Sequence, residues 1–124
     1  MATHPPLQTE AGATAVFVGT MRTQNQGAAV AAMTLEHYPT MTQKYLEGLR
    51  DEALTRWGLL DLLIVHRYGE LAPGDPIVLV AAWSAHRHAA FDACRAVMEE
   101  LKARAPFWKR ELTANGPRWV TPDS

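Results

Sequence analysis

The stretch HRHAAFDACRAVMEELKARAPFWKRE, residues 86–111, decides how the rest of the chain is expected to fold. Its apolar side chains recur with a spacing near 3.6 residues, which is typical of a helix packed on one face; they are Phe91, Cys94, Val97, Met98 and Leu101. Pro106 cannot continue a helix, so we expect the helix to end there. An amphipathic segment, residues 107–111, then follows.

The beginning of this helix is predicted to lie at the end of a buried strand. The apolar run IVLVAAWSA, residues 77–85, leads directly into His86 and Arg87. A helix N-terminus presents free backbone N–H groups and the positive end of the helix dipole, both of which favour an anion. We therefore interpret His86 and Arg87 as candidate anion-binding residues, although a solvated basic helix face is the common alternative.

Length and composition indicate one globular domain, residues 1–124, with residues 1–11 as a loose N-terminal arm. The formal net charge of −1 gives no overall field for binding nucleic acid. No apolar run approaches the length of a membrane span, and the polar N-terminus does not resemble a signal peptide. The single cysteine, Cys94, excludes an internal disulfide and fits a reducing compartment, so we expect a cytoplasmic protein.

The remaining segments predict an α+β domain with a mixed antiparallel sheet and two main helices. Residues 13–22 and 28–38 read as two strands that form a hairpin-like pair across a mobile loop, residues 23–27. A helix is expected from Pro39 to Trp57. Strands are expected at 59–71 and 76–85, the latter covered on both faces because it is almost continuously apolar. A short last strand is expected at 118–120.

The chain lacks several familiar catalytic signatures. It has no glycine-rich phosphate loop and no GxSxG motif. His86 and His88 form an HxH pair, but no carboxylate or cysteine accompanies them at ligand spacing, so we predict no metal site and no cofactor. What remains is a set of cations at the ends of predicted elements, which suits a small anionic substrate such as a phosphate; the set comprises Arg22, His86, Arg87, Lys102 and Lys109.

These cations cannot all meet one small substrate within a single chain. His86 and Lys102 are sixteen positions apart, which is roughly 24 Å along a helix that rises about 1.5 Å per residue. Either the two residues serve different sites, or a second copy of the chain supplies one of them across a two-fold interface.

The chain resembles the large, catalytic subunit of molybdopterin synthase over about residues 12–120. The resemblance is carried by GATAVFVGTMR (12–22), LEHYPTM (35–41), HRYGEL (66–71), PGD (73–75), SAHRHAAFDACR (84–95), LKARAPFWKRE (101–111) and RWV (118–120). The combination of HR-x3-F with LK-x3-P-x-WK-x-E is specific to this family.

The resemblance implies an α/β hammerhead fold and a sulfur-transfer reaction. Such a subunit converts cyclic pyranopterin monophosphate into molybdopterin, with sulfur from the C-terminal thiocarboxylate of a small ubiquitin-like subunit. It also implies a homodimer within a heterotetramer. By residue, it implies Lys102 and Lys109 as catalytic lysines and Arg22, His86 and Arg87 as substrate-binding residues. Phe17 and Met98 would line the channel for the partner's glycine-ended tail.

One departure from the family pattern concerns the N-terminus. Members usually carry a further strand and helix before the GA-x-x-x-F-x-G segment, where this chain has about a dozen residues. We expect this to affect a sheet edge and the affinity for the partner, and not the chemistry.

Two other functions compete with sulfur transfer. One is a non-catalytic dimeric scaffold that only docks a ubiquitin-like partner, and the other is a phosphate-ester hydrolase that needs no protein partner. Within the preferred function, Lys102 is our first choice for the catalytic amine, with Lys109 stabilising negative charge or sharing proton transfer. Neighbouring cations and desolvation would have to lower the pKa of Lys102 for that role.

Overall fold

The computed structural model describes residues 9–25 and 28–120. In order, these residues form β1 Ala13–Thr20, β2 Gln24–Asn25, β3 Ala28–His37, α2 Pro39–Trp57, β4 Asp61–His66, β5 Gly69–Leu71, β6 Pro76–Ser84, α3 Arg87–Arg104, β7 Phe107–Thr113 and β8 Gly116–Val120. Every strand pair is antiparallel. The predicted α+β class with two main helices is confirmed; most of the expected N-terminal arm and residues 26–27 of the expected loop lie outside the described residues.

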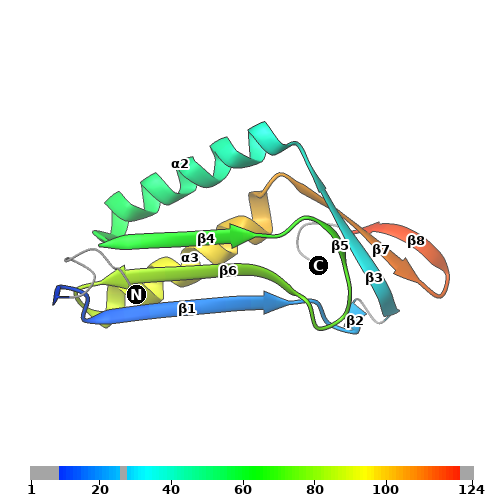
Figure 1. Cartoon of the computed structure of the whole chain (residues 1–124), viewed down its shortest axis with the longest axis horizontal. Helices are drawn as coiled ribbons and strands as arrows, with labels where there is room; N and C mark the ends of the chain where they lie inside the picture. The colour runs from blue at the N-terminus through cyan, green and yellow to red at the C-terminus, as the bar shows by residue number, and fades with distance from the viewer. Residues whose placement is uncertain (1–8, 26–27, 121–124) are drawn as a thin grey trace.

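The first sheet has the strand order β1-β6-β4, and both helices lie on one of its faces (Figure 1). The core between them is made of small and branched side chains, including Val80, Ala82 and Leu62 from the sheet and Ala93 and Val97 from α3. Burial of this apolar surface is the main force that holds the helices on the sheet. As predicted, α2 starts with proline and is closed by a left-handed Gly58 with φ of 59°.

The second sheet lies beyond the C-terminal end of α3 and is organised around β3 (Figure 1). One edge of β3 pairs with β7, which continues to β8, while the other edge pairs with β2 and β5. A separate small core gathers under this sheet; it consists of Met21, Val30, Met33, Leu35 and Leu71. The chain passes from α3 to β7 through Ala105 and Pro106, so the two sheets meet where the helix ends.

One predicted pairing and the extent of one predicted strand are wrong. The strand at 13–20 does not form a hairpin with 28–37: β1 pairs with β6 in the first sheet, and β3 belongs to the second. The run 59–71 is not one strand, because it breaks into β4 and β5 at Arg67 and Tyr68, and these strands belong to different sheets. Gly69, with φ of 85°, allows the change of direction that an uninterrupted strand could not make.

The apolar stripe of α3 also differs at one position from its prediction. Cys94, Val97 and Leu101 are buried and Met98 is half-buried, as expected, but Phe91 is 65% exposed. Ala90 and Ala93 take its place against the sheet. Small residues there let the first half of α3 lie close to β1 and β6, which leaves no room for a phenyl ring beneath it.

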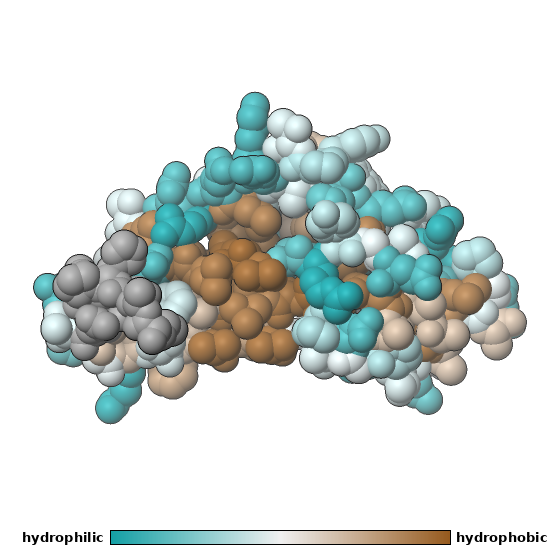
Figure 2. Space-filling view, in the orientation of Figure 1, coloured by the Kyte–Doolittle hydropathy of each residue, from teal (hydrophilic) through white to brown (hydrophobic). Residues whose placement is uncertain are grey.

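The other face of the first sheet is open. Val16 and Val18 of β1 and Leu63 and Val65 of β4 are 46–59% exposed. Ala81 and Leu79 of β6 stand between them in register, which makes one continuous apolar surface. Figure 2 shows this surface as a hydrophobic patch in the middle of the molecule. The predicted burial of β6 agrees with the structure, since its residues from Ile77 to Ser84 are buried or half-buried; the exposed side chains of this face belong to the flanking strands β1 and β4. No helix in the described ranges has the length and apolar content that crossing a membrane requires.

Candidate active site

Lys109 occupies the junction of the two sheets. Residues of β7 alternate between faces, so Phe107, Lys109 and Glu111 share the inner face. Burial lowers the pKa of Lys109, the positive charges of Lys102 and Arg22 lower it further, and Glu111 opposes the shift. Because charges act strongly on one another only at short range in a protein, these residues lie together. The structure thus gathers three of the predicted site residues, Arg22, Lys102 and Lys109.

Arg22 is placed by the segment that leaves β1. The Met21 N–H donates to the Asp75 carbonyl over 2.9 Å, and the Gly74 N–H donates back to the Met21 carbonyl over 2.8 Å. The Met21 side chain is buried in the core of the second sheet. This anchoring leaves Arg22 exposed immediately after the fixed residue, where its guanidinium reaches Asn25 Oδ1 at 3.5 Å.

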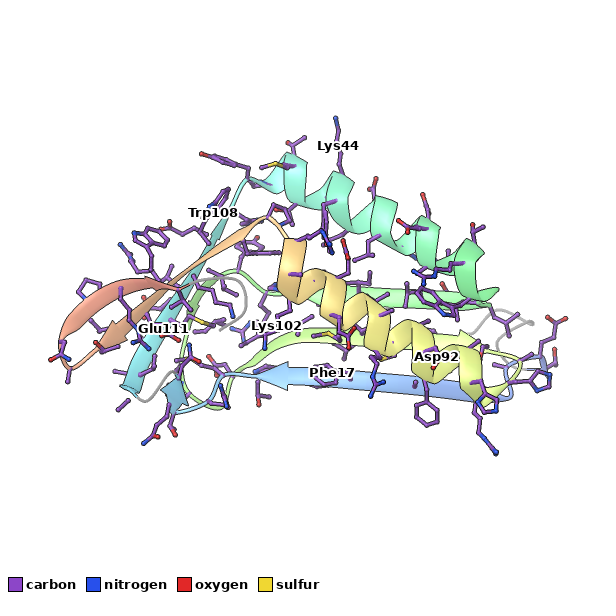
Figure 3. All side chains as sticks on the ribbon, turned by 180° about the vertical axis from the view of Figure 1, so that it is seen from behind. Phe17, Lys44, Asp92, Lys102, Trp108 and Glu111 are labelled. Atoms are coloured by element: carbon purple, nitrogen blue, oxygen red, sulfur yellow. The ribbon has the colours of Figure 1, made fainter. Side chains whose placement is uncertain are left out.

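Lys102 lies in the last turn of α3 and is exposed. Figure 3 shows it near the C-terminal end of the helix, between the first sheet and the β3–β7–β8 sheet. The sequence favours Lys102 as the catalytic amine; in the structure, burial and nearby cations lower the pKa of Lys109. The physical reason is that Lys109 is the more buried of the two and feels the charge of Lys102.

Glu111 is the one carboxylate among the causes of the Lys109 shift, and it is only 4% exposed. Its Oε1 accepts from Arg118 Nε at 3.1 Å and Nη2 at 2.9 Å, and its Oε2 accepts from Asn25 Nδ2 at 2.9 Å. Arg118 also donates to the Asn25 carbonyl over 2.8 Å. A buried carboxylate with both oxygens satisfied can remain charged, so the cationic site contains a fixed negative charge.

His86 and Arg87 are not part of this gathering within one chain. They form the N-cap and the first residue of α3, at the opposite end of the helix from Lys102. Asp92, near that end, lies far from Lys102 in Figure 3. The predicted separation within a subunit is therefore confirmed by the course of the helix, and the predicted anion site at the α3 N-terminus remains a prediction.

Phe17 and Met98 lie on the side of β1 that faces α3. Phe17 shares its strand face with the core residue Ala15 and is 44% exposed. The Cys94 thiol donates to the Val80 carbonyl over 3.7 Å, and Val80 pairs with Phe17 in register, which places α3 above this part of β1. Met98 follows Cys94 by one turn and Lys102 follows Met98 by another, so all three share a helix face. A channel past these residues, as the resemblance implies, would lead toward Lys102.

An aromatic stack lies beside Lys109 on the inner face of β7. The His66 ring stacks on Phe107 with centroids 3.9 Å apart, and His37 stacks on the same ring at 5.3 Å. The His66 Nδ1–H donates to the Arg67 carbonyl over 2.8 Å. Burial lowers the pKa of His66, the hydrogen bond to Arg67 opposes this, and the charges of Lys109 and His37 add to the lowering. His66 therefore favours the neutral form beside the cationic site.

The cationic residues favour an anionic substrate and not a metal ion. Among the described residues no group of three or more His, Cys, Asp or Glu side chains could hold a metal. Two lysines, one of them with a lowered pKa, can exchange a proton with a bound substrate. A fold of two antiparallel sheets with such a pair at their junction defines an α+β protein that has the groups to bind an anion and to perform acid–base or nucleophilic chemistry.

Comparison with known proteins identifies the family to which the chain is similar. The family model described as MoaE protein matches residues 2–104. The molybdopterin synthase catalytic subunit of Pseudomonas aeruginosa is 60% identical over 109 residues, which are 88% of this chain and 73% of that protein. The solved structure of the molybdopterin biosynthesis MoaE protein from Burkholderia ambifaria is 50% identical with a TM-score of 0.78, covering 96% of this chain and 78% of that one. That of molybdopterin synthase from Staphylococcus aureus is 34% identical with a TM-score of 0.84, covering 90% and 82%.

The chain belongs to the MoaE protein family, as the resemblance in its sequence indicated. Three residues at its site were not predicted from the sequence: Asn25, Glu111 and Arg118. The sequence holds one feature that could have predicted Glu111: it follows Lys109 by two positions in an amphipathic segment, and residues two apart in a strand share a face. No feature of the sequence predicts Asn25 or Arg118 at the site, because both contact Glu111 only through the pairing of strands that are distant in the sequence.

Proposed function

We propose that this chain works as the catalytic subunit of molybdopterin synthase. It would convert cyclic pyranopterin monophosphate into molybdopterin with sulfur from the C-terminal thiocarboxylate of a small ubiquitin-like subunit. The observation that carries the proposal is the gathering of Arg22, Lys102 and Lys109 at the junction of the two sheets, with a lowered pKa on Lys109. Such a site can hold a phosphorylated substrate and also move protons near neutral pH.

The two lysines have different places in this proposal. Lys102 is exposed and shares a helix face with Met98, so it is the amine that a substrate or the acyl group of an incoming tail would meet first. Lys109 is half-buried and releases its proton more readily than an ordinary lysine. Lys109 in its neutral form would accept a proton from Lys102, which then acts as base or nucleophile.

Arg22, His86 and Arg87 would bind the phosphate and pterin. Arg22 lies with the lysines, whereas His86 and Arg87 lie at the far end of α3. We therefore propose that His86 and Arg87 act in the site of a second copy. Phe17 and Met98 would line the channel for the partner's tail, since both border the space between β1 and α3 that leads to Lys102.

The open face of the first sheet supports a homodimer. An exposed apolar surface that continues across three strands marks an interaction site, and this face contains Val16, Val18, Leu63 and Val65. We propose that a second copy of the chain covers it and that each copy of the dimer carries one small subunit, which gives a heterotetramer. We also place the reaction in the cytoplasm, which the single, unpaired Cys94 supports.

The experiment that tests this function mixes the purified protein with a thiocarboxylated small subunit and cyclic pyranopterin monophosphate, and assays dithiolene product. We expect product only when both are present. Retained binding of the small subunit without product would instead support a docking scaffold. Release of inorganic phosphate without the small subunit would support a phosphate-ester hydrolase.

A further inference from the structure

The Glu111 carboxylate is bound by two residues with no assigned role. Arg118 of β8 contacts Oε1 through two nitrogens, and the salt bridge measures 2.9 Å. Asn25 of β2 donates to Oε2 over 2.9 Å. Arg118 is in turn tied to Asn25 by a 2.8 Å hydrogen bond to its carbonyl, so the three residues form a closed triangle. Three strands, β2, β7 and β8, thus converge on one carboxylate.

This triangle is connected to the catalytic cations on two sides. Glu111 lies two residues from Lys109 on the same face of β7, and its charge acts on Lys109. The Asn25 side chain uses its other atom, Oδ1, to accept a 3.5 Å contact from Arg22. Asn25 is therefore a bridge, with its amide nitrogen on Glu111 and its amide oxygen on Arg22.

We propose that Arg118 and Asn25 are positioning residues of the active site: they fix the Glu111 carboxylate and share its charge, and Asn25 also aligns Arg22. The inference rests on the proposed function, because it assigns these residues to that reaction. Its physical basis is charge balance. A buried carboxylate with two charge-assisted contacts from a guanidinium is partly neutralised, and so it pulls less strongly on a nearby ammonium.

The proposal makes predictions of opposite sign for two variants. The charged groups around Lys109 are Lys102 from α3, Arg22 after β1, Glu111 on β7 and Arg118 on β8, and the titratable His66 of β4 also faces it. Arg118→Met leaves the Glu111 charge uncompensated, which stabilises the Lys109 ammonium and raises its pKa. Glu111→Gln removes the one negative charge and leaves Arg118 in place, which lowers the pKa of Lys109. We expect each shift to be about half a pH unit or more.

The test is an NMR titration of purified protein that carries 13C-labelled lysine. The chain has only three lysines, Lys44, Lys102 and Lys109. The signal that is missing from the spectrum of the Lys109→Arg variant is that of Lys109. Arg110→Met and Glu36→Gln are matched controls, because both side chains are exposed and lie on the outer face of the same sheet. In both control variants the pKa of Lys109 should equal that of the wild type. Arg118→Lys, which keeps the positive charge, should return Lys109 close to its wild-type value.

A raised pKa of Lys109 in Arg118→Met together with a lowered pKa of Lys109 in Glu111→Gln supports the inference. Unchanged titration in both, or shifts in the same direction, overturns it. If Arg118→Met does not fold, as judged by its thermal melt, Arg118→Gln takes its place, and a failure of that variant to raise the pKa of Lys109 overturns the inference. For Asn25→Ala, we expect a several-fold higher KM for cyclic pyranopterin monophosphate, and an unchanged KM removes Asn25 from the proposal. The titration needs no substrate, so a failure of the proposed function would not hide its result.

Discussion

Lys102 and Lys109 carry the same ammonium group in different surroundings. Lys102 stands at the exposed end of α3, where the carbonyl end of the helix dipole favours its charge. Lys109 is enclosed between strands and lies near two other cations. Environment and not residue type therefore makes one lysine exposed and gives the other a lowered pKa.

The lowered pKa of Lys109 predicts a pH dependence. The neutral amine of Lys109 accumulates as pH rises through a pKa that lies below the ordinary 10.5. The rate of sulfur transfer should therefore increase with pH in that range, which gives the pH–rate profile a rising limb. Lys109→Arg stays charged throughout. We expect this variant to lose the limb and roughly 10- to 100-fold of the rate near neutral pH. Lys44→Arg on α2 is the control for the substitution itself, and a wild-type pH profile in Lys109→Arg would refute the role.

Met98 is the residue whose enlargement should block the tail channel. It is half-buried at the border of the core and precedes Lys102 by one helical turn. In Met98→Trp we expect at least tenfold weaker binding of the small subunit or a comparable loss of sulfur transfer, with the dimer intact. Binding is measured by titration calorimetry and assembly by sedimentation. Met41→Trp, at an exposed position of α2, should have no effect. Unchanged turnover in Met98→Trp would remove Met98 from the channel.

At the scale of elements, the sequence predicts local features well and pairings poorly. The β6–α3 junction and the ends of α2 follow from apolar spacing, proline and glycine, all of which act within a few residues. The β1–β6 pairing joins Phe17 to Val80. In the Glu111 network, Asn25 contacts Glu111, which is 86 positions away in the sequence, and Arg118, which is 93 positions away. Such contacts leave no periodic signal. Lys102, Lys109 and Arg22 were predicted as cations at the ends of expected elements, and the family resemblance supplied their individual roles.

The aromatic stack under β7 should make folding stability depend on pH. The pKa of His66 lies below its ordinary value of 6.5 in the folded state, chiefly because the ring is buried. Between the two values the unfolded chain binds more protons than the folded one, so stability falls as pH drops below about 6.5. His66→Gln should flatten this fall when thermal melting is followed from pH 7.5 to 5. His88→Gln on exposed α3 surface should leave it unchanged, and a wild-type slope in His66→Gln would contradict the argument.

At the scale of the whole molecule, two features of the single chain are incomplete. The apolar face of the β1-β6-β4 sheet is uncovered, and His86 and Arg87 are separated from the lysines by the length of α3. A second copy resolves both, because a two-fold interface buries the same surface on each subunit and can form composite sites. The catalytic unit would then be the dimer.

Mixing two inactive variants tests composite sites. His86→Ala and Lys102→Ala each disable one half of a shared site, so a hybrid dimer retains one intact site. We expect the mixture, after dissociation and reassociation, to recover up to roughly a quarter of wild-type activity, since half the dimers are hybrids with one working site of two. Mass spectrometry of differently tagged chains confirms hybrid formation. Hybrids that form and stay inactive would rule out a shared site.

Single-turnover dithiolene formation by Lys102→Arg tests directly whether the lysine pair at the sheet junction performs sulfur transfer. Arginine keeps the positive charge but cannot release its proton in this pH range. We expect a rate lowered by roughly 100-fold or more, a larger loss than in Lys109→Arg, with substrate and small-subunit binding retained and Lys44→Arg as active as the wild type. Near-wild-type turnover by Lys102→Arg would contradict that role of the lysine pair.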